Sequence, residues 1–243
     1  MRIKREKIYE GVAVIVNQAH PLKEQKVSLC PADDRYAGIL LARKAAYLLR
    51  ECIKACGGRQ EIVPVSGWRS HAEQQQIWDE SMAKSGEAFT RQYVALPGCS
   101  EHQTGLAIDL GRAAKQIDFI CPDFPEEGAC AAFRRLAAQY GFITRYPHGK
   151  EHLTGIAHEP WHFRYIGMPH AMLIERNGLC LEEYPDFLRQ KPRMFSLAHG
   201  RTIQVFYVPC PEEQVEINLP EGCCQISGDN ISGFFVTAWG CTA

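Results

Sequence analysis

The sequence contains no segment suited to enter or cross a membrane. Its charged N-terminus, Met1–Lys7, is followed only by a short apolar run, Val12–Val16, which is too short for a transmembrane helix and which we expect to form an opening strand. No small-residue cleavage site of a signal peptide follows it, and no internal repeat or low-complexity tract occurs elsewhere. We therefore expect a cytoplasmic protein with no membrane span.

Neither sign of charge is in excess. The formal net charge is −1, and no basic stripe or platform of stacking aromatic side chains stands out. These features exclude a general attraction to nucleic acids or to anionic membranes. The sequence also lacks the Gly-x-Ser-x-Gly elbow of many serine hydrolases, so a covalent acyl-enzyme built on that pattern is not expected.

The cysteines lack the spacing of a disulfide framework. There are eleven of them, an odd number, and none forms a Cys-x-x-Cys pair. Cys52 and Cys56 fall on one face of an expected helix, where free cysteine commonly serves as a small buried apolar residue. We therefore expect reduced thiols, as in a cytoplasmic protein.

What is present is the composition of an ordinary globular protein. Hydrophobic residues make up 46% of the chain and charged residues 23%, and 243 residues suit one sizeable domain with a small appendage. After Pro192 the pattern changes to short β-prone runs separated by turns. We expect a main domain over residues 1–193 and a small β-rich appendage over residues 194–243.

Three segments of the main domain predict clear elements. The capping box that begins at Ser70 predicts a helix that ends at about Lys84. Leu106–Leu110 is a short apolar run broken by one acid, which predicts a buried strand. Trp161–Ile166 alternates between apolar and polar residues and predicts a further strand.

His102 and Asp109 are the first pair of candidate functional residues. Gly105 lies between them and favours a turn, because glycine adopts positive φ without steric cost. The turn lets His102 come from a loop and Asp109 from the buried strand, so both can reach one ion. An unpaired buried carboxylate is very costly, and a metal ion is one partner that removes this cost. The alternative is that His102 caps a turn and Asp109 sits in an ion pair.

A second cluster, Glu159-Pro160-Trp161-His162, supplies a further carboxylate and a further imidazole. Pro160 holds Glu159 extended, so the cluster does not form the helix of a His-Glu-x-x-His zinc site. His162 can complete a set of two imidazoles and one carboxylate with an open fourth position, the usual ligand set of catalytic zinc. Glu159 is then the candidate general base. The alternative is an exposed Glu159 and a packed His162.

The two clusters together form a specific pattern. Ser-x-His-x-x-Gly-x-Ala-x-Asp, which runs from Ser100 to Asp109, is followed by Glu-x-x-His and resembles the family of zinc D,D-peptidases that includes VanX, VanY and VanXY. The likeness extends over roughly positions 10 to 190 and is closest to the bifunctional VanXY type. It implies an α+β fold in which helices pack against a mostly antiparallel central sheet, with the C-terminal β appendage in addition.

The resemblance also implies roles for individual residues. One zinc ion per chain would be held by His102, Asp109 and His162. Glu159 would take the proton of the attacking water. Arg69 would stabilise the oxyanion, whereas the sequence alone would favour a surface arginine there. Ser100 and Gln74 resemble substrate-contacting positions, although both residue types are commonly caps or exposed polar groups.

By the same resemblance, the chain hydrolyses free D-Ala-D-Ala and removes the terminal D-Ala of peptidoglycan precursors, which destroys the target of vancomycin. Two other functions stay open. One is a cell-wall endopeptidase on the same zinc scaffold, which would ordinarily be exported, and the other is a cell-wall-binding protein without activity. The pattern assigns neither the ratio of the two activities nor an oligomeric state.

A competing pattern lies at His148-Gly149-Lys150-Glu151-His152, which fits the His-x-x-Glu-His sequence of some metalloproteases. That pattern requires a helix that brings both imidazoles onto one face. Pro147 directly before the pattern, Gly149 within it and Gly155 shortly after it all disfavour a stable helix. We therefore expect no metal site in this segment.

Overall fold

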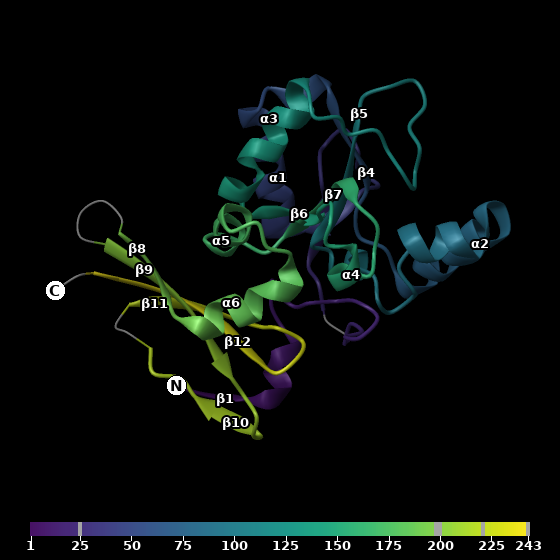
Figure 1. Ribbon diagram of the computed structural model, residues 1–243. Helices are drawn as coiled ribbons and strands as arrows, with labels where there is room; N and C mark the ends of the chain where they lie inside the picture. Colours follow the sequence, from purple (N-terminus) through teal and green to yellow (C-terminus); the bar gives the residue numbers. More distant parts are fainter. Residues whose placement is uncertain (24–25, 197–200, 220–221, 242–243) are drawn as a thin grey trace. The chain divides into compact units, whose positions relative to one another are not determined.

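The computed structural model describes residues 1–23, 26–196, 201–219 and 222–241 (Figure 1). Its contacts divide the chain into two compact units. The first, which we call the central unit, is the continuous segment Val16–Cys180. The second, which we call the terminal unit, combines Met1–Ile15 with Leu181–Ala243.

A four-stranded antiparallel sheet forms the centre of the central unit. Its strands are β4 (Ile62–Ser66), β5 (Ala107–Arg112), β6 (Phe142–Tyr146) and β7 (Glu159–Tyr165), and they lie in the order β4-β5-β7-β6. As an inner strand β5 is buried over residues 107–111, which accounts for its nearly continuous apolar sequence. The strands expected at Leu106–Leu110 and Trp161–Ile166 are confirmed as β5 and β7.

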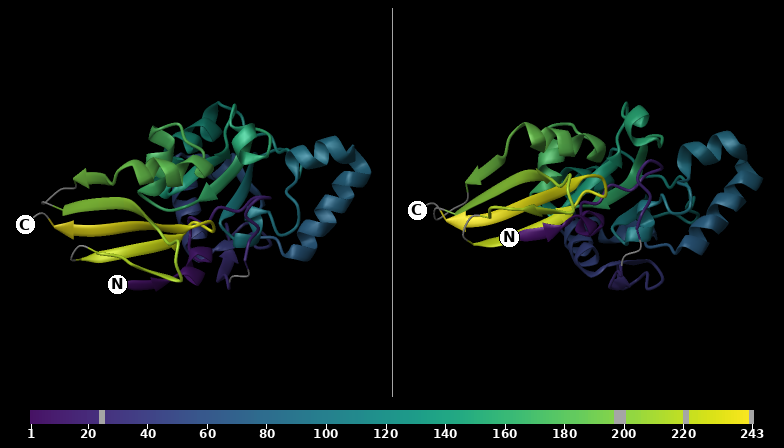
Figure 2. Two further views of the ribbon diagram at one scale, coloured as in Figure 1. Left: turned by 60° about the horizontal axis from the view of Figure 1, so that its bottom comes forward. Right: turned by 90° about the horizontal axis from the view of Figure 1, so that it is seen from below.

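Helices accompany this sheet and complete the predicted α+β fold. α1 (Arg43–Ala55), α3 (Gly128–Ala137) and α5 (His170–Arg176) gather on one side of it, whereas α2 (His71–Tyr93) projects away from it (Figures 1 and 2). The shorter elements of the unit are β2 (Leu29–Pro31), β3 (Leu40–Ala42), α4 (Glu151–Thr154) and the 3-10 helices η2 (Gly58–Gln60), η3 (Glu101–Thr104) and η4 (Ala138–Tyr140). Among the described residues, no helix combines the length and the apolar character needed to cross a membrane.

The capping box predicted at the start of α2 is present. The Ser70 hydroxyl accepts a hydrogen bond from the backbone N–H of Glu73 (3.2 Å), and the Glu73 carboxylate accepts one from the backbone N–H of Ser70 (2.7 Å). The predicted end of this first helical segment near Lys84 agrees with the structure, because the backbone leaves helical geometry at Gly86, where φ is 81° and ψ is 171°. Glycine adopts this φ without steric cost. A second helical segment follows the kink and runs to Tyr93, so α2 consists of two segments.

The terminal unit is built on a second antiparallel sheet. Its strands β8 (Arg193–Ser196), β9 (Arg201–Pro209), β11 (Cys223–Gly228) and β12 (Gly233–Cys241) lie in the order β11-β12-β9-β8. A separate pair joins β1 (Arg2–Lys4) to β10 (Gln214–Glu216). The helical segments are η1 (Arg5–Tyr9), η5 (Leu181–Glu183) and α6 (Tyr184–Gln190). An apolar cluster unites Ile3 and Ile8 with Ile217, Phe234 and Val236.

The division between the units differs from the boundary expected at residue 193. Met1–Ile15 and residues 181–190 group with the C-terminal strands, because β1 pairs with β10 and Ile8 packs in the same cluster as Phe234. Pairing between the two ends of a chain leaves no local signal in the sequence. The strand expected at Val12–Val16 does not form, since this segment is irregular, although residues 13–16 are buried. That residues 194–243 fold as an independent unit stays a prediction.

Candidate metal centre and active site

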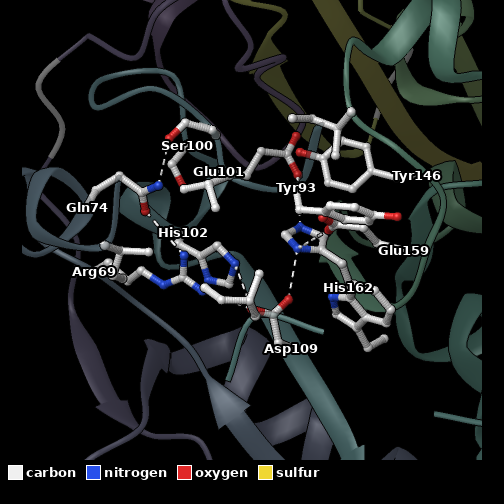
Figure 3. A pocket seen from close by; sticks show the side chains of 16 residues that line it. Arg69, Gln74, Tyr93, Ser100, Glu101, His102, Asp109, Tyr146, Glu159 and His162 are labelled. Carbon is white, nitrogen blue, oxygen red and sulfur yellow. Dashed lines mark hydrogen bonds and ion pairs between the residues drawn. The ribbon is translucent and has the colours of Figure 1, made fainter. Parts of the chain in front are cut away.

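A pocket in the central unit collects side chains from β5, β7, α2 and η3 (Figure 3). Among the polar side chains that line it are Arg69, Gln74, Ser100, Glu101, His102, Asp109, Tyr146, Glu159 and His162. The fold thus brings every site residue expected from the sequence into one pocket.

Three of these residues form a cluster that can hold a metal ion. One possible ligand atom from each of His102, Asp109 and His162 lies within 4.8 Å of the other two. Asp109 on β5 and His162 on β7 are direct partners in the sheet register, and Asp109 Oδ1 lies 2.9 Å from His162 Nδ1. Asp109 Oδ2 lies 3.1 Å from His102 Nε2. Each of the three residues is only 4% exposed, so their charges require compensation within the site.

The turn at Gly105 carries His102 to the end of the strand. η3 ends at Thr104 and is capped by Gly105, whose φ of 69° lies in the left-handed region that favours glycine, and β5 begins two residues later at Ala107. His102 Nδ1 lies 2.7 Å from the carbonyl oxygen of Gly67. A carbonyl only accepts hydrogen bonds, so Nδ1 carries the proton and Nε2 presents its lone pair to the cluster.

Glu159 lies where a general base is expected. It is the first residue of β7, and Pro160 follows it, so its side chain extends from a strand and not from a helix. Glu159 Oε2 lies 3.5 Å from His162 Nδ1. Burial raises the pKa of Glu159 to about 8, although the nearby His162 and Arg69 oppose this shift. A carboxyl group with such a pKa can exchange a proton near neutral pH.

Arg69 is held inside the pocket. Its Nη2 donates a hydrogen bond to Asp109 Oδ2 (2.9 Å), and its Nε donates to the Ser66 hydroxyl (2.8 Å). Its Nη1 donates to Gln74 Oε1 at 3.3 Å. The Arg69 side chain is 12% exposed, which excludes the alternative of an ordinary surface arginine. Hydrogen bonds to three partners fix the plane of the guanidinium beside the metal cluster.

Ser100 and Gln74 offer different groups to a substrate. The Gln74 amide is fully buried, and its N–H donates to the carbonyl oxygen of Ala95 (2.8 Å) while its oxygen accepts from Arg69. Gln74 is therefore occupied in orienting Arg69. Ser100 lines the same pocket immediately before η3, and within the described part of the chain its hydroxyl caps no backbone N–H. The Ser100 hydroxyl is thus the one of the two that is available to a ligand.

The pKa values of the three proposed ligands are shifted in opposite directions by their surroundings. Burial alone would raise the pKa of Asp109, but the two histidines outweigh it and hold that pKa well below its usual range. Burial and the charge of Arg69 lower the pKa of His102 to about 4. For His162 burial acts in the same direction, but the Asp109 carboxylate outweighs it and raises the pKa to about 9. His102 is therefore neutral at pH 7, whereas His162 must release a proton before it can bind a metal.

The donor atoms of this cluster fit zinc. Two imidazole nitrogens and one carboxylate, beside a pocket that leaves a further position open, match the ligand set of catalytic zinc sites. Asp109 Oδ1 is buried and makes no hydrogen bond of acceptable geometry among the described residues, as expected of an atom suited to a cation. Within the described ranges this is also the one cluster of three such residues close enough to share an ion.

The competing pattern at His148–His152 does not build a comparable cluster. A single helical turn, α4, forms there, and it begins at Glu151, after His148. The ring of His148 instead packs against that of His158, with centroids 5.8 Å apart. The two imidazoles of the pattern therefore do not share a helix face, in agreement with the glycines and the proline in this segment.

Glu101 is the main residue of the pocket that the sequence analysis did not single out. It is 1% exposed, and its Oε1 accepts a hydrogen bond from Arg145 Nε at 2.7 Å. Arg164 Nε lies 3.6 Å from its other carboxylate oxygen. Burial would raise the pKa of Glu101, but the two arginines outweigh it and hold that pKa at about 2. The one sequence signal that could have identified Glu101 is its place as an acidic residue between Ser100 and His102.

Comparisons with known proteins agree with this geometry. A family model described as VanY, D-alanyl-D-alanine carboxypeptidase, matches residues 38–168. The chain is 42% identical to the bifunctional D-Ala-D-Ala dipeptidase and D-Ala-D-Ala carboxypeptidase VanXYC of Enterococcus gallinarum, over 75% of this chain and 97% of that protein. It is similar to the crystal structure of the vancomycin resistance D,D-dipeptidase VanXYg in complex with a D-Ala-D-Ala phosphinate analog, with a TM-score of 0.94 and 48% identity over 99% of this chain and 98% of that chain. A VanY mutant in complex with Zn(II) matches with a TM-score of 0.58 and 30% identity over 71% of this chain and 98% of that chain.

Proposed function

Because the chain belongs to the VanY family of D-alanyl-D-alanine carboxypeptidases, we propose a specific part in that chemistry for each residue of its pocket. The protein is a D,D-peptidase of the bifunctional VanXY type, which hydrolyses D-Ala-D-Ala and removes the terminal D-Ala of peptidoglycan precursors. These reactions remove the D-Ala-D-Ala ends that vancomycin binds, and so confer resistance to it. The observation that carries the residue assignments is the His-Asp-His cluster beside Glu159 in one pocket.

One zinc ion per chain is held by His102 Nε2, the Asp109 carboxylate and His162 Nδ1. The distances of 3.1 and 2.9 Å from the carboxylate to these nitrogens support the assignment, because a cation bound at about 2 Å from each donor fits among them. The relative solved in complex with Zn(II) supports the identity of the metal. When bound, zinc lowers the pKa of a water molecule and polarises the substrate carbonyl.

Glu159 acts first as general base and then as general acid. Its carboxylate takes a proton from the attacking water, and the resulting carboxylic acid gives it to the amine of the departing D-Ala. Its position 3.5 Å from His162 Nδ1 supports this role. Burial, which favours the protonated form of Glu159, supports its second step.

Arg69 stabilises the negative charge that develops on the carbonyl oxygen during attack. Its guanidinium is already fixed by Ser66, Gln74 and Asp109, so little reorganisation is needed when the charge appears. The Ser100 hydroxyl binds the substrate backbone. Gln74 contributes to binding mainly through the orientation of Arg69.

The cellular location and the role of the C-terminal segment stay predictions. The ten cysteines that the structure describes are free thiols, the form that a reducing compartment such as the cytoplasm maintains. Residues 194–243 contribute no zinc ligand in this proposal, because the three ligands belong to the central unit.

Assays on two substrates test this function. Purified protein is incubated with D-Ala-D-Ala and with a pentapeptide precursor that ends in D-Ala-D-Ala, before and after treatment with a chelator. We expect release of D-Ala from both substrates, loss of both activities with the chelator, and recovery with one equivalent of zinc. Zinc binding without release of D-Ala from either substrate would indicate a binding protein. Cleavage of cell-wall cross-links alone would indicate an endopeptidase.

A further inference from the structure

Glu101 lies on the opposite side of His162 from the proposed metal site. Figure 3 shows His162 between the carboxylates of Glu101 and Asp109. Glu101 Oε2 lies 3.8 Å from His162 Nε2, and both atoms are buried and make no hydrogen bond among the described residues. The distance exceeds that of a hydrogen bond, but a movement of about 1 Å would bring the two atoms into hydrogen-bonding range.

The two histidines direct opposite ring nitrogens at the cluster. His102 presents Nε2 to Asp109, and its Nδ1 is fixed by the carbonyl oxygen of Gly67. His162 presents Nδ1 to Asp109, so its Nε2 points away from the cluster. The group that faces this Nε2 is the Glu101 carboxylate. Glu101 therefore faces the ring nitrogen of His162 that is turned away from Asp109, just as the Gly67 carbonyl faces the corresponding nitrogen of His102.

Two arginines hold the Glu101 carboxylate in place. Arg145 Nε donates to Oε1 at 2.7 Å, and Arg164 Nε lies 3.6 Å from Oε2. The side chains of all three residues are fully buried, with 0% exposed. Buried ion pairs are often no more stabilising than well-packed apolar residues, because removing the charges from water is costly. Such a set next to a ligand histidine therefore suggests a role beyond stability.

We propose that Glu101 is a positioning residue of the zinc site, which accepts a hydrogen bond from the Nε2–H group of His162 and thereby leaves the lone pair of the ring on Nδ1. This fixes the tautomer and the ring orientation of His162 and makes Nδ1 a stronger ligand. Arg145 and Arg164 keep the carboxylate charged and aimed at the ring. The inference rests on the proposed function, because it takes His162 to be a zinc ligand.

The zinc affinity of a Glu101→Gln variant of the full chain tests this role. Glutamine keeps the size of the side chain and one oxygen but removes the charge. We expect zinc affinity, measured by competition with a chelator, to fall about 10–100-fold. Long-range ¹H–¹⁵N NMR of the zinc-loaded protein should also show a shifted His162 Nε2 signal. Asp33→Asn is the matched control, because Asp33 is a buried carboxylate paired with Arg35 outside the pocket. It should change neither quantity.

A second variant separates positioning from simple charge balance. Glu101→Gln removes the negative charge that Arg145 and Arg164 share, and the single variant could fail to fold for that reason. Glu101→Gln combined with Arg164→Met restores the net charge of the set. If Glu101 positions His162, the double variant regains thermal stability while its zinc affinity stays about 10–100-fold low. Zinc affinity equal to that of the parent in the folded double variant would overturn the proposal.

His162→Ala, measured in the same series, separates this inference from the proposed function. If His162→Ala retains zinc, the ligand assignment itself fails, and with it the basis for a role of Glu101. If His162→Ala loses zinc and Glu101→Gln retains the affinity of the parent, the ligand assignment holds and only the role of Glu101 is refuted.

Discussion

Two pairs of histidines in the central unit match metal-binding patterns, but the fold brings only one pair to a shared carboxylate. His102 and His162 are far apart in the sequence, yet the pairing of β5 with β7 brings them to one carboxylate. His148 and His152 are close in the sequence, yet the single turn of α4 does not include both. Short spacing therefore matters less than the register of the strands and turns that direct the side chains.

Removal of a proposed zinc ligand should produce the largest difference between the two histidine pairs. Asp109→Ala or His162→Ala leaves only two donors, so we expect loss of zinc and of activity. His148→Ala and His152→Ala should retain both. Elemental analysis of the folded variants measures the difference. Zinc loss in the latter pair would restore the competing site, and unchanged zinc in the former pair would refute the ligand assignment.

Replacement of the proposed base should affect catalysis without affecting the metal. General-base catalysis is typically worth ~10²–10⁴-fold in rate, so Glu159→Gln should lose at least that much turnover. Its zinc content and its binding of D-Ala-D-Ala should be unchanged. Glu151→Gln, which alters the acid of the competing pattern, is the control and should keep parental turnover. Turnover of Glu159→Gln within a few-fold of the parent would place the base elsewhere.

Loss of the proposed oxyanion donor should be less severe. Removal of one such donor commonly lowers kcat by about 10²–10³-fold, and we expect a loss of this size for Arg69→Ala. Because Glu159 is intact, the variant should still depend on a group that loses its proton near neutral pH. Lys150→Ala, a cation of the competing pattern, serves as the control. A pH–rate profile of each variant measures both quantities, and a profile of Arg69→Ala that no longer rises with pH through the neutral range would contradict the division of roles.

The pH dependence of zinc binding should provide the smallest effect for each step, about tenfold per pH unit, and the most specific one. The Asp109 carboxylate raises the pKa of His162 to about 9 in the metal-free chain, so below that pH zinc must displace a proton from its ligand. Zinc affinity should therefore rise with pH, by about tenfold per unit for each proton released, and level off near pH 9. Calorimetry in buffers of different ionisation enthalpy measures the proton release directly. An affinity that is independent of pH between about 6 and 8 would show that His162 is already deprotonated.

Much of the site could be predicted because its signals are local. The apolar run around Asp109 and the glycine at position 105 predict β5 and the turn before it, and both are observed. The contacts of Glu101 could not be predicted, because Arg145 and Arg164 reach it from later strands whose pairing no local pattern encodes. The same holds for Tyr146, whose ring centroid lies 4.9 Å from that of His162 across the β6–β7 pair. Side chains that meet through strand pairing become visible only once the register is known.

The short η3 helix restricts how this segment of the chain can change during evolution. Successive side chains of a 3-10 helix point about 120° apart, which lets the neighbours Glu101 and His102 address different partners on opposite sides of the site. Insertion or deletion of one residue in η3 would rotate each later side chain by about 120°, so that these two groups could not both keep their present directions. Related proteins should therefore keep the length of η3, although the residue types at the exposed positions around it can vary. Loops whose neighbouring side chains do not both contact the site should accumulate insertions.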